Sequence, residues 1–323
     1  MPGEELTQAV LEGDRRALAR VITLVENDTV VGQRALDELF LATGKAHVIG
    51  VTGASGAGKS TLVNALVEAM LKQDAEKHIG VIAVDPTSPF SGGAMLGDRI
   101  RMRAIAENPN VFIRSMASRG TLGGLAENTQ AVSMVLDAAG YDPIIVETVG
   151  AGQAEVEIAR LAHSVIVVEA PGFGDDIQVA KAGILEIADI LVLNKADKAD
   201  VDAAEIALRS LISTGYPSQV VKQGYWIPPI VRTIATTGEG VAEVSHALQA
   251  HAEFLRGTGG WRKRDQIRLE TFFRGLIERR RNQEWELLQQ NEKFQYLFEQ
   301  FLNRELSPYA ALEQMQSNSL LKI

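Results

Sequence analysis

Residues 48–61 read Val48-Ile-Gly-Val-Thr-Gly53-Ala-Ser-Gly-Ala-Gly58-Lys59-Ser60-Thr61. The part from Gly53 to Ser60 matches the pattern G-x-x-x-x-G-K-[ST] in full, after a short apolar run and before a helical pattern at 61–71. Glycines let the backbone turn its N–H groups inward, and the helix that follows adds the positive end of its dipole. The segment therefore predicts a phosphate-binding loop. A glycine-rich turn before a helix is the alternative, which the full motif disfavours.

Two side chains of this loop have separate expected roles. Lys59 would reach the β- and γ-phosphates of a nucleotide, and the Ser60 hydroxyl would be a ligand of Mg²⁺. The residues expected to contact the nucleotide here are Gly53, Ala54, Ser55, Gly56, Ala57, Gly58, Lys59, Ser60 and Thr61.

Seven short apolar runs recur along the middle of the chain, with longer helical patterns between them. Runs that are nearly continuous in apolar residues are typical of strands buried on both faces of a parallel sheet. We therefore expect an α/β fold, a P-loop NTPase with a mainly parallel, doubly wound sheet. The predicted strands are 47–51, 81–84, 111–114, 144–147, 165–168, 190–193 and 230–234.

Helical patterns flank this region on both sides. The helices predicted before it are 7–11, 15–26 and 31–43. We expect three parts, an N-terminal helical extension, a P-loop domain and a C-terminal helical region, at 1–44, 45–255 and 256–323. Aromatic residues and leucine recur at helical spacing in the last part, which favours a dimerisation arm. A helix that lies on a membrane is the alternative.

Composition excludes several classes of protein. The chain has 323 residues with 32 Lys and Arg against 41 Asp and Glu, a net charge of −9, which argues against a general nucleic-acid binder. The absence of cysteine excludes disulfides, thiolate metal sites and cysteine catalysis. The five histidines show no metal-binding spacing. No apolar run approaches the roughly 18 residues of a membrane span, and no secretory signal is evident, so we expect a cytoplasmic protein.

The residues after two later strands indicate which base is bound. Asn194-Lys195-Ala196-Asp197 follows a predicted strand, and the Asp197 carboxylate can accept from both N1–H and the 2-amino group of guanine, donors that adenine lacks. Asn194 and Lys195 would brace the loops and cover the ring. The backbone N–H of Ala235 would meet guanine O6, although Ile234 replaces the serine usual in that loop. Together these features favour GTP over ATP.

Acidic residues after other strands are candidates for sensing the γ-phosphate. Glu147-Thr-Val-Gly150 matches the D-x-x-G switch motif of GTPases with Glu for Asp, so Gly150 would offer its N–H to the γ-phosphate. Glu147, with Asp85 and Asp98, would hold Mg²⁺ beside Ser60; solvated loop carboxylates are the alternative. Gln153 could orient the attacking water, or be an ordinary polar loop residue.

These residues resemble one family, the MeaB/ArgK/MMAA methylmalonyl-CoA mutase-associated GTPases of the SIMIBI class. The matching sequence segments run along nearly the whole chain. They include Val84-Asp-Pro-Thr-Ser-Pro89, Gly97-Asp-Arg-Ile-Arg-Met102, Ser118-Arg-Gly-Thr-Leu-Gly-Gly-Leu125, Glu147-Thr-Val-Gly-Ala-Gly-Gln153 and Pro171-Gly-Phe-Gly-Asp175. The two segments that begin at Ser118 and Glu147 are far more specific for this family than a P-loop alone.

The resemblance implies a function. Members hydrolyse GTP and escort adenosylcobalamin-dependent acyl-CoA mutases, gating cofactor loading and protecting or reactivating the mutase. It also implies a homodimer formed through the C-terminal helices, and it suggests the cobalamin adenosyltransferase as a further partner. Switch segments would include Arg99, and a segment with Asp175 and Lys181 would relay the nucleotide state to the mutase.

Two alternatives stay open at this point. A GTPase metallochaperone that delivers a bare metal such as nickel shares the P-loop, sheet and dimer, but needs Cys or His ligands. A scaffold that binds nucleotide without hydrolysis would release no phosphate with any partner. The intact set of Lys59, Ser60, Asp98 and Glu147 counts against the scaffold.

Overall fold

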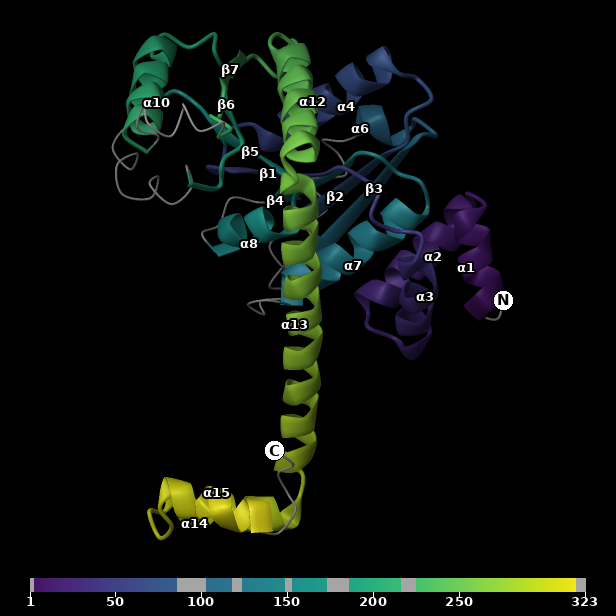
Figure 1. Ribbon diagram of the computed structural model, residues 1–323, viewed down its shortest axis with the longest axis vertical. Helices are drawn as coiled ribbons and strands as arrows, with labels where there is room; N and C mark the ends of the chain where they lie inside the picture. The colour runs from purple at the N-terminus through teal and green to yellow at the C-terminus, as the bar shows by residue number, and fades with distance from the viewer. Residues whose placement is uncertain are drawn as a thin grey trace. The chain divides into compact units, whose positions relative to one another are not determined.

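A seven-stranded parallel sheet forms the centre of the chain, with the strand order β3-β2-β4-β1-β5-β6-β7 (Figure 1). The computed structural model describes residues 3–85, 103–117, 124–148, 153–172, 186–215 and 225–317. The strands are β1 (Val48–Gly53), β2 (Ile79–Asp85), β3 (Val111–Ala117), β4 (Ile144–Thr148), β5 (Ser164–Glu169), β6 (Ile190–Asn194) and β7 (Ile230–Thr233). The predicted parallel, doubly wound sheet is confirmed. Each predicted apolar run overlaps one of these strands, although His47 lies one residue before β1 and Ile234 one residue after β7.

The strands are buried because helices cover both faces of the sheet. Successive residues of a strand point to opposite faces, so Val48 and Val146 belong to one hydrophobic cluster and Ile49 and Ile145 to the other. With both faces covered, every position of β1, β4, β5 and β6 is buried, whereas β7 at the edge of the sheet is partly exposed. This explains why the strands are apolar at nearly every residue instead of at every second one.

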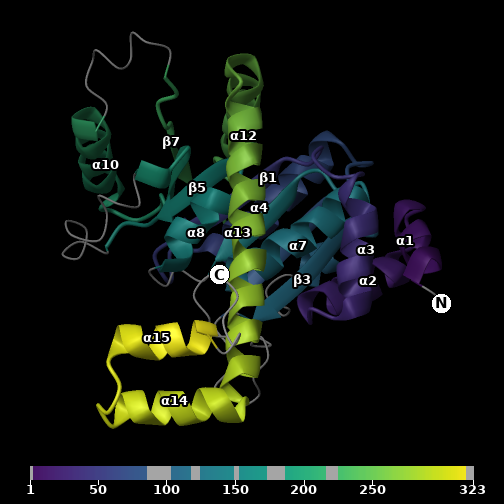
Figure 2. The same cartoon turned by 60° about the horizontal axis from the view of Figure 1, so that its bottom comes forward.

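Different helices cover the two faces (Figures 1 and 2). One face carries α4 (Lys59–Gln73) and α12 (Val241–Thr258), with α6 (Arg103–Ala106) against α4. The other carries α7 (Gly124–Ala138) and α8 (Gln153–Leu161). Helix α10 (Val201–Gly215) packs on β6 and β7.

The N-terminal helices add an outer layer over α7. They are α1 (Gly3–Leu11), α2 (Arg15–Glu26) and α3 (Val30–Phe40), and α2 and α3 both contact α7. The predicted extension of α3 to Thr43 is wrong. After Phe40 the N–H groups of Ala42 and Thr43 donate to carbonyl oxygens three residues earlier instead of four, so the α-helix ends. The Gly44 N–H then donates to Asp137 Oδ2 over 2.6 Å. This contact turns the chain out of the helix and into β1.

Contacts divide the chain into two compact units, Met1–Phe272 and Phe273–Ile323. Helix α13 (Gly260–Gln289) contributes to both, and α14 (Glu292–Leu302) and α15 (Pro308–Ser317) belong to the second. The second unit has its own small core of Phe294, Leu297 and Met315. The predicted boundaries after residues 44 and 255 stay predictions. Within the described residues, no helix is both long and apolar enough to cross a membrane.

Candidate nucleotide-binding site

The carboxyl ends of the parallel strands meet at one edge of the sheet. There β1 ends at Gly53, β4 at Thr148 and β6 at Asn194. The strand that follows β1 in the chain, β2, lies on one side of it in the sheet, and β5 and β6 lie on the other. Ligands of open α/β sheets bind where the strand order reverses in this way. The phosphate-binding loop predicted from the sequence lies at this point.

The loop between β1 and α4 needs its glycines. Gly53 has φ +131°, and a Cβ there would lie 2.0 Å from the Val168 carbonyl oxygen. Gly58 precedes α4 with φ +96°, and its Cβ would lie 2.3 Å from Asn194 Nδ2. Residues with a side chain rarely adopt positive φ, and neither position has room for one. The first and last glycines of the motif therefore allow strands β5 and β6 to close around the loop.

Lys59 brings a positive charge into the loop. It is the first residue of α4 and is 6% exposed. Its Nζ donates to the carbonyl oxygens of Gly53, over 2.8 Å, and Ala54, over 3.0 Å. A buried ammonium at a helix N-terminus attracts an anion through both its charge and the helix dipole. Ser55, Gly56 and Thr61 lie exposed in and beside the same loop.

Ser60 and Glu147 meet although they are far apart in the sequence. The Ser60 hydroxyl donates to Glu147 Oε1 over 2.6 Å, and the Glu147 side chain is 5% exposed. Ser60 is the second residue of α4, whose loop follows β1, and β1 lies beside β4, with Val51 opposite Glu147. A hydroxyl and a carboxylate oxygen are the hard ligands that Mg²⁺ prefers. This donor pair therefore fits the magnesium site expected beside the phosphates.

Asn194 connects three segments around the loop. Its Nδ2 donates to the Ala57 carbonyl oxygen over 2.8 Å. Its Oδ1 accepts from the Thr233 hydroxyl and from the Ala235 N–H, each over 3.1 Å. Lys195 Nζ donates to the Gly56 carbonyl oxygen over 2.7 Å. The predicted guanine segment is thus joined to the phosphate-binding loop by side-chain bonds.

The other two predicted base contacts, Asp197 and Ala235, lie near Asn194. Asp197 follows Asn194 by three residues and is exposed, as a carboxylate that accepts from a ligand must be. Ala235 is buried, and in the structure its N–H donates to Asn194 Oδ1. Its contact with guanine O6 stays a prediction. The loop that follows is closed by the Ile234 N–H, which donates to the Glu239 carbonyl oxygen over 3.0 Å.

Several predicted residues fall outside what the structure describes. They are Asp98, Arg99, Gly150, Asp175 and Lys181, together with the side chains of Asp85 and Gln153. By backbone, Asp85 is the last residue of β2 and Gln153 the first of α8. Within the described residues, no group of three or more His, Cys, Asp or Glu side chains could hold a metal ion.

Sequence reasoning missed a chain of buried polar side chains at the opposite edge of the sheet. Ser164 Oγ lies 2.7 Å from His47 Nε2 and 2.8 Å from His251 Nδ1. His251 Nε2 lies 3.2 Å from Asp189 Oδ1, to which Arg264 Nη2 donates over 2.7 Å. The five residues come from five separate segments. The only local signal is a polar residue at the start of β1, β5 and β6.

Burial and hydrogen bonding determine the protonation of His47 and Asp189 in this row of polar side chains. It lowers the pKa of His47 well below its usual value, and the charges of His163, His251 and Arg256 act in the same direction. Burial alone would raise the pKa of Asp189, but hydrogen bonds from His251 and Arg264 outweigh it and hold that pKa below its usual range. At neutral pH, His47 is therefore neutral, and Asp189 is an anion paired with Arg264.

Comparison with known proteins identifies the family. The model of the family "Methylmalonyl Co-A mutase-associated GTPase MeaB" matches residues 18–287. The chain belongs to the MeaB family. The resemblance found in the sequence is confirmed, and this MeaB-family protein is a GTP hydrolase that binds guanine nucleotides.

Curated and solved relatives agree with this assignment. A GTPase of Pyrococcus horikoshii is 42% identical over 316 residues, which cover 97% of this chain and 96% of the relative. GTPase ArgK of Escherichia coli is 34% identical, over 96% of this chain and 95% of ArgK. The crystal structure of an LAO/AO transport system kinase has a TM-score of 0.69 and 29% identity, over 99% of this chain and 98% of that one. It shows the same P-loop fold.

A further relative bears on the cellular role of the family. The methylmalonic aciduria type A homolog of Caenorhabditis elegans, a mitochondrial protein, is 30% identical over 281 residues, which cover 83% of this chain and 70% of the relative. The family description names an association with methylmalonyl-CoA mutase. MeaB-family GTPases are thus linked to one class of partner enzyme.

Proposed function

We propose that this chain is a Mg²⁺-dependent GTPase that escorts an adenosylcobalamin-dependent acyl-CoA mutase, with methylmalonyl-CoA mutase as the first candidate. It would gate cofactor loading and protect or reactivate the mutase, and act as a homodimer through its C-terminal helices. The cobalamin adenosyltransferase is a further candidate partner. The observation that carries the proposal is the match to the MeaB family, because that family is associated with the mutase.

The phosphate end of the site supports the GTPase mechanism. The loop from Gly53 to Gly58 would offer backbone N–H groups to the phosphates at the start of α4, and Lys59 would add a positive charge. Ser60 and Glu147, with Asp85 and Asp98, would hold Mg²⁺. When bound, Mg²⁺ offsets the negative charge that builds up on the phosphates during transfer.

The remaining predicted residues would complete the reaction and report its outcome. Asp197 would accept the two donors of the guanine edge, with Asn194 and Lys195 holding its loop against the P-loop. Gln153 would orient the attacking water. Gly150 would donate to the γ-phosphate and lose that contact after hydrolysis. Arg99, Asp175 and Lys181 would pass the change to the mutase.

Phosphate release tests this proposal. Release would be measured with GTP and with ATP, with Mg²⁺, alone and with a purified adenosylcobalamin-dependent methylmalonyl-CoA mutase from the same genome. The proposal expects GTP-selective release that the mutase stimulates. GTP hydrolysis without stimulation by any acyl-CoA mutase of that genome would support the GTPase activity and contradict the escort role. Preference for ATP would contradict the assignment of guanine as the bound base.

A further inference from the structure

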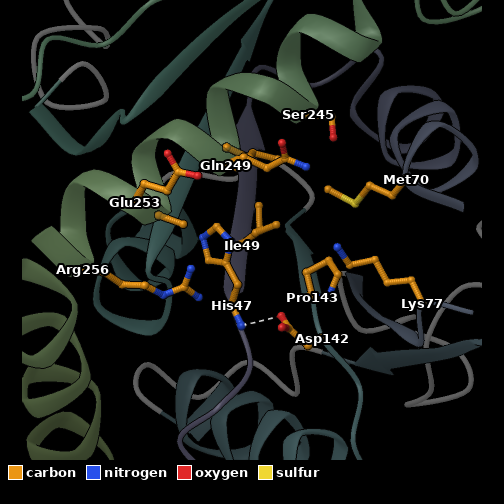
Figure 3. A pocket seen from close by; sticks show the side chains of 12 residues that line it. His47, Ile49, Met70, Lys77, Asp142, Pro143, Ser245, Gln249, Glu253 and Arg256 are labelled. Atoms are coloured by element: carbon orange, nitrogen blue, oxygen red, sulfur yellow. Dashed lines mark hydrogen bonds between the residues drawn. The ribbon is translucent and has the colours of Figure 1, made fainter. Parts of the chain in front are cut away.

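A hollow opens at the edge of the sheet opposite the phosphate-binding loop (Figure 3). It measures about 190 Å³ and lies between the start of β1, the segment after α4, the start of β4, and α12. Its apolar lining includes Ile49, Met70 and Leu248. It shares no residue with the phosphate-binding loop or the guanine segment, so neither nucleotide site explains it.

The hollow contains a buried histidine with one ring nitrogen left for a ligand. His47 lines it and is 9% exposed. Its Nε2 lies 2.7 Å from Ser164 Oγ, which in turn lies 2.8 Å from His251 Nδ1, so one ring nitrogen of His47 is bonded within the buried network. Among the described residues, no group bonds the other ring nitrogen, Nδ1, so it is available to a polar group of a ligand in the hollow.

Four charged side chains line the hollow together with His47. In Figure 3, Lys77 and Asp142 lie on one side of the hollow, and Glu253 and Arg256 on the other. Asp142 accepts from the His47 N–H over 2.9 Å, and the Arg256 guanidinium carbon lies 4.4 Å from the Trp261 ring centroid. Within the described residues, none of the four forms an ion pair with another. Each side therefore presents one acid and one base with capacity left for a ligand.

This balance of charge selects the kind of ligand. A simple anion would be attracted by Lys77 and Arg256 but repelled by Asp142 and Glu253, and a simple cation would meet the reverse. A molecule with one charge of each sign can satisfy both pairs. The volume of 190 Å³ corresponds to about six waters at about 30 Å³ each, room for a ligand of about seven or eight non-hydrogen atoms. The apolar residues would cover a short aliphatic segment between its charges.

We propose that this hollow binds a small zwitterion, a molecule with one ammonium group and one carboxylate group joined by a short aliphatic segment. The ammonium group lies against an acid of the hollow, the carboxylate lies against a base, and one of these two groups bonds His47 Nδ1. Because the site is separate from the nucleotide site, the inference does not depend on the proposed partner mutase.

Thermal unfolding of the full chain tests the proposal without any activity readout. The probes are 4-aminobutanoate, 5-aminopentanoate and 6-aminohexanoate, which differ only in the spacing of their charges. Pentanoate and pentylamine, each with a single charge, serve as comparisons at the same ionic strength. We expect a saturable rise in Tm of a few degrees with at least one zwitterion, and a smaller or no rise with the single ions.

Matched variants locate the binding. Lys77→Gln and Glu253→Gln should each abolish the rise, since each removes one charge of the hollow. Two exposed residues outside the hollow serve as controls, Lys72 near the end of α4 and Glu243 on α12, and Lys72→Gln and Glu243→Gln should retain the rise. The proposal is overturned if no zwitterion raises Tm, if pentanoate or pentylamine does as well, or if the rise survives in the two hollow variants.

Discussion

Asn194 Nδ2 donates to the carbonyl oxygen of Ala57 over 2.8 Å, so the last residue of β6 is bonded directly to the phosphate-binding loop. The two residues are 137 positions apart in the chain. The bond makes the shape of the phosphate site depend on the segment that we propose recognises the base. We therefore expect binding of the base and binding of the phosphates to be coupled through this buried amide.

Replacing Asn194 with Ala should weaken both parts of the site. The change leaves the Ala57 carbonyl oxygen and the Ala235 N–H without their partner, at about 1–3 kcal/mol per buried group. We expect GDP and GTP affinities to fall at least about tenfold in a fluorescence titration. Thr233→Val removes only one bond to the same side chain and should cost less; equal losses would argue against the bridging role of Asn194.

Lys59→Ala should remove turnover while the protein stays folded. The ammonium would be the positive charge that the described part of the loop offers to the phosphates, and removing a preorganised donor of this kind slows catalysis by about a hundredfold or more. Phosphate release at saturating GTP would measure the loss, with circular dichroism as the check on folding. Turnover at the wild-type rate would refute the assignment of the loop.

Asp197→Asn should change which base is preferred. The amide keeps one acceptor and gains a donor, so it no longer matches the two donors of guanine. The expected loss of GTP affinity is roughly tenfold to a hundredfold, for one charged hydrogen bond. Xanthosine triphosphate carries a carbonyl where guanine has its amino group, and should bind the variant better than the wild type. An unchanged preference for GTP would show that Asp197 does not contact the base.

Glu147→Gln should raise the Mg²⁺ concentration that turnover requires. The amide oxygen can still accept from the Ser60 hydroxyl, so the fold around the pair is retained. Its lower charge weakens a metal ligand, and we expect the Mg²⁺ concentration for half-maximal turnover to rise by about tenfold or more. Ser60→Ala should shift the same titration in the same direction. Identical titrations for wild type and both variants would exclude this pair from the metal site.

Stability should fall as the pH is lowered from 6.5 towards 4, in part because of His163. Burial lowers its pKa to about 4, and the Val48 N–H donates to its Nδ1, which holds the ring neutral. Between these pH values the unfolded chain binds a proton at this residue and the native chain does not. Stability therefore rises with pH through this window, by about 1.4 kcal/mol per pH unit for each such group.

Denaturant titrations at several pH values between 4.5 and 6.5 measure this slope. In His163→Asn the side-chain oxygen can still accept from the Val48 N–H, but nothing titrates, so the slope should decrease by up to one proton. His246→Asn, exposed on α12, should keep the wild-type slope. The same slope in all three proteins would show that His163 makes no such contribution.

Much of the fold could be predicted because its signals are local. The seven apolar runs coincide with the seven strands, since burial on both faces demands apolar residues at nearly every strand position. Helix α2 begins where Asp14 caps it, with Asp14 Oδ1 accepting from the Arg16 and Ala17 N–H groups. The end of α3 was missed, because the side chain of Asp137, distant in the sequence, decides where the chain leaves that helix.

The candidate site divides in the same way. Gly53 and Gly58 could be predicted from the sequence, because the loop between a strand and a helix requires positive φ at these positions. The chain from His47 through Ser164 and His251 to Asp189 could not, because no periodicity joins these four residues. It exists because β1, β5 and β6 begin at the same edge of the sheet, and α12 passes beside them.

The loop from Gly53 to Ser60, the strand before it and the helix after it follow from local sequence, since they depend on contacts within a few residues. The position of β4 beside β1 comes from tertiary packing, and it brings Ser60 within 2.6 Å of Glu147 across 87 positions. Strand order depends on how the helices pack on both faces of the sheet, a cooperative choice among distant segments. No stretch of this sequence carries that choice alone.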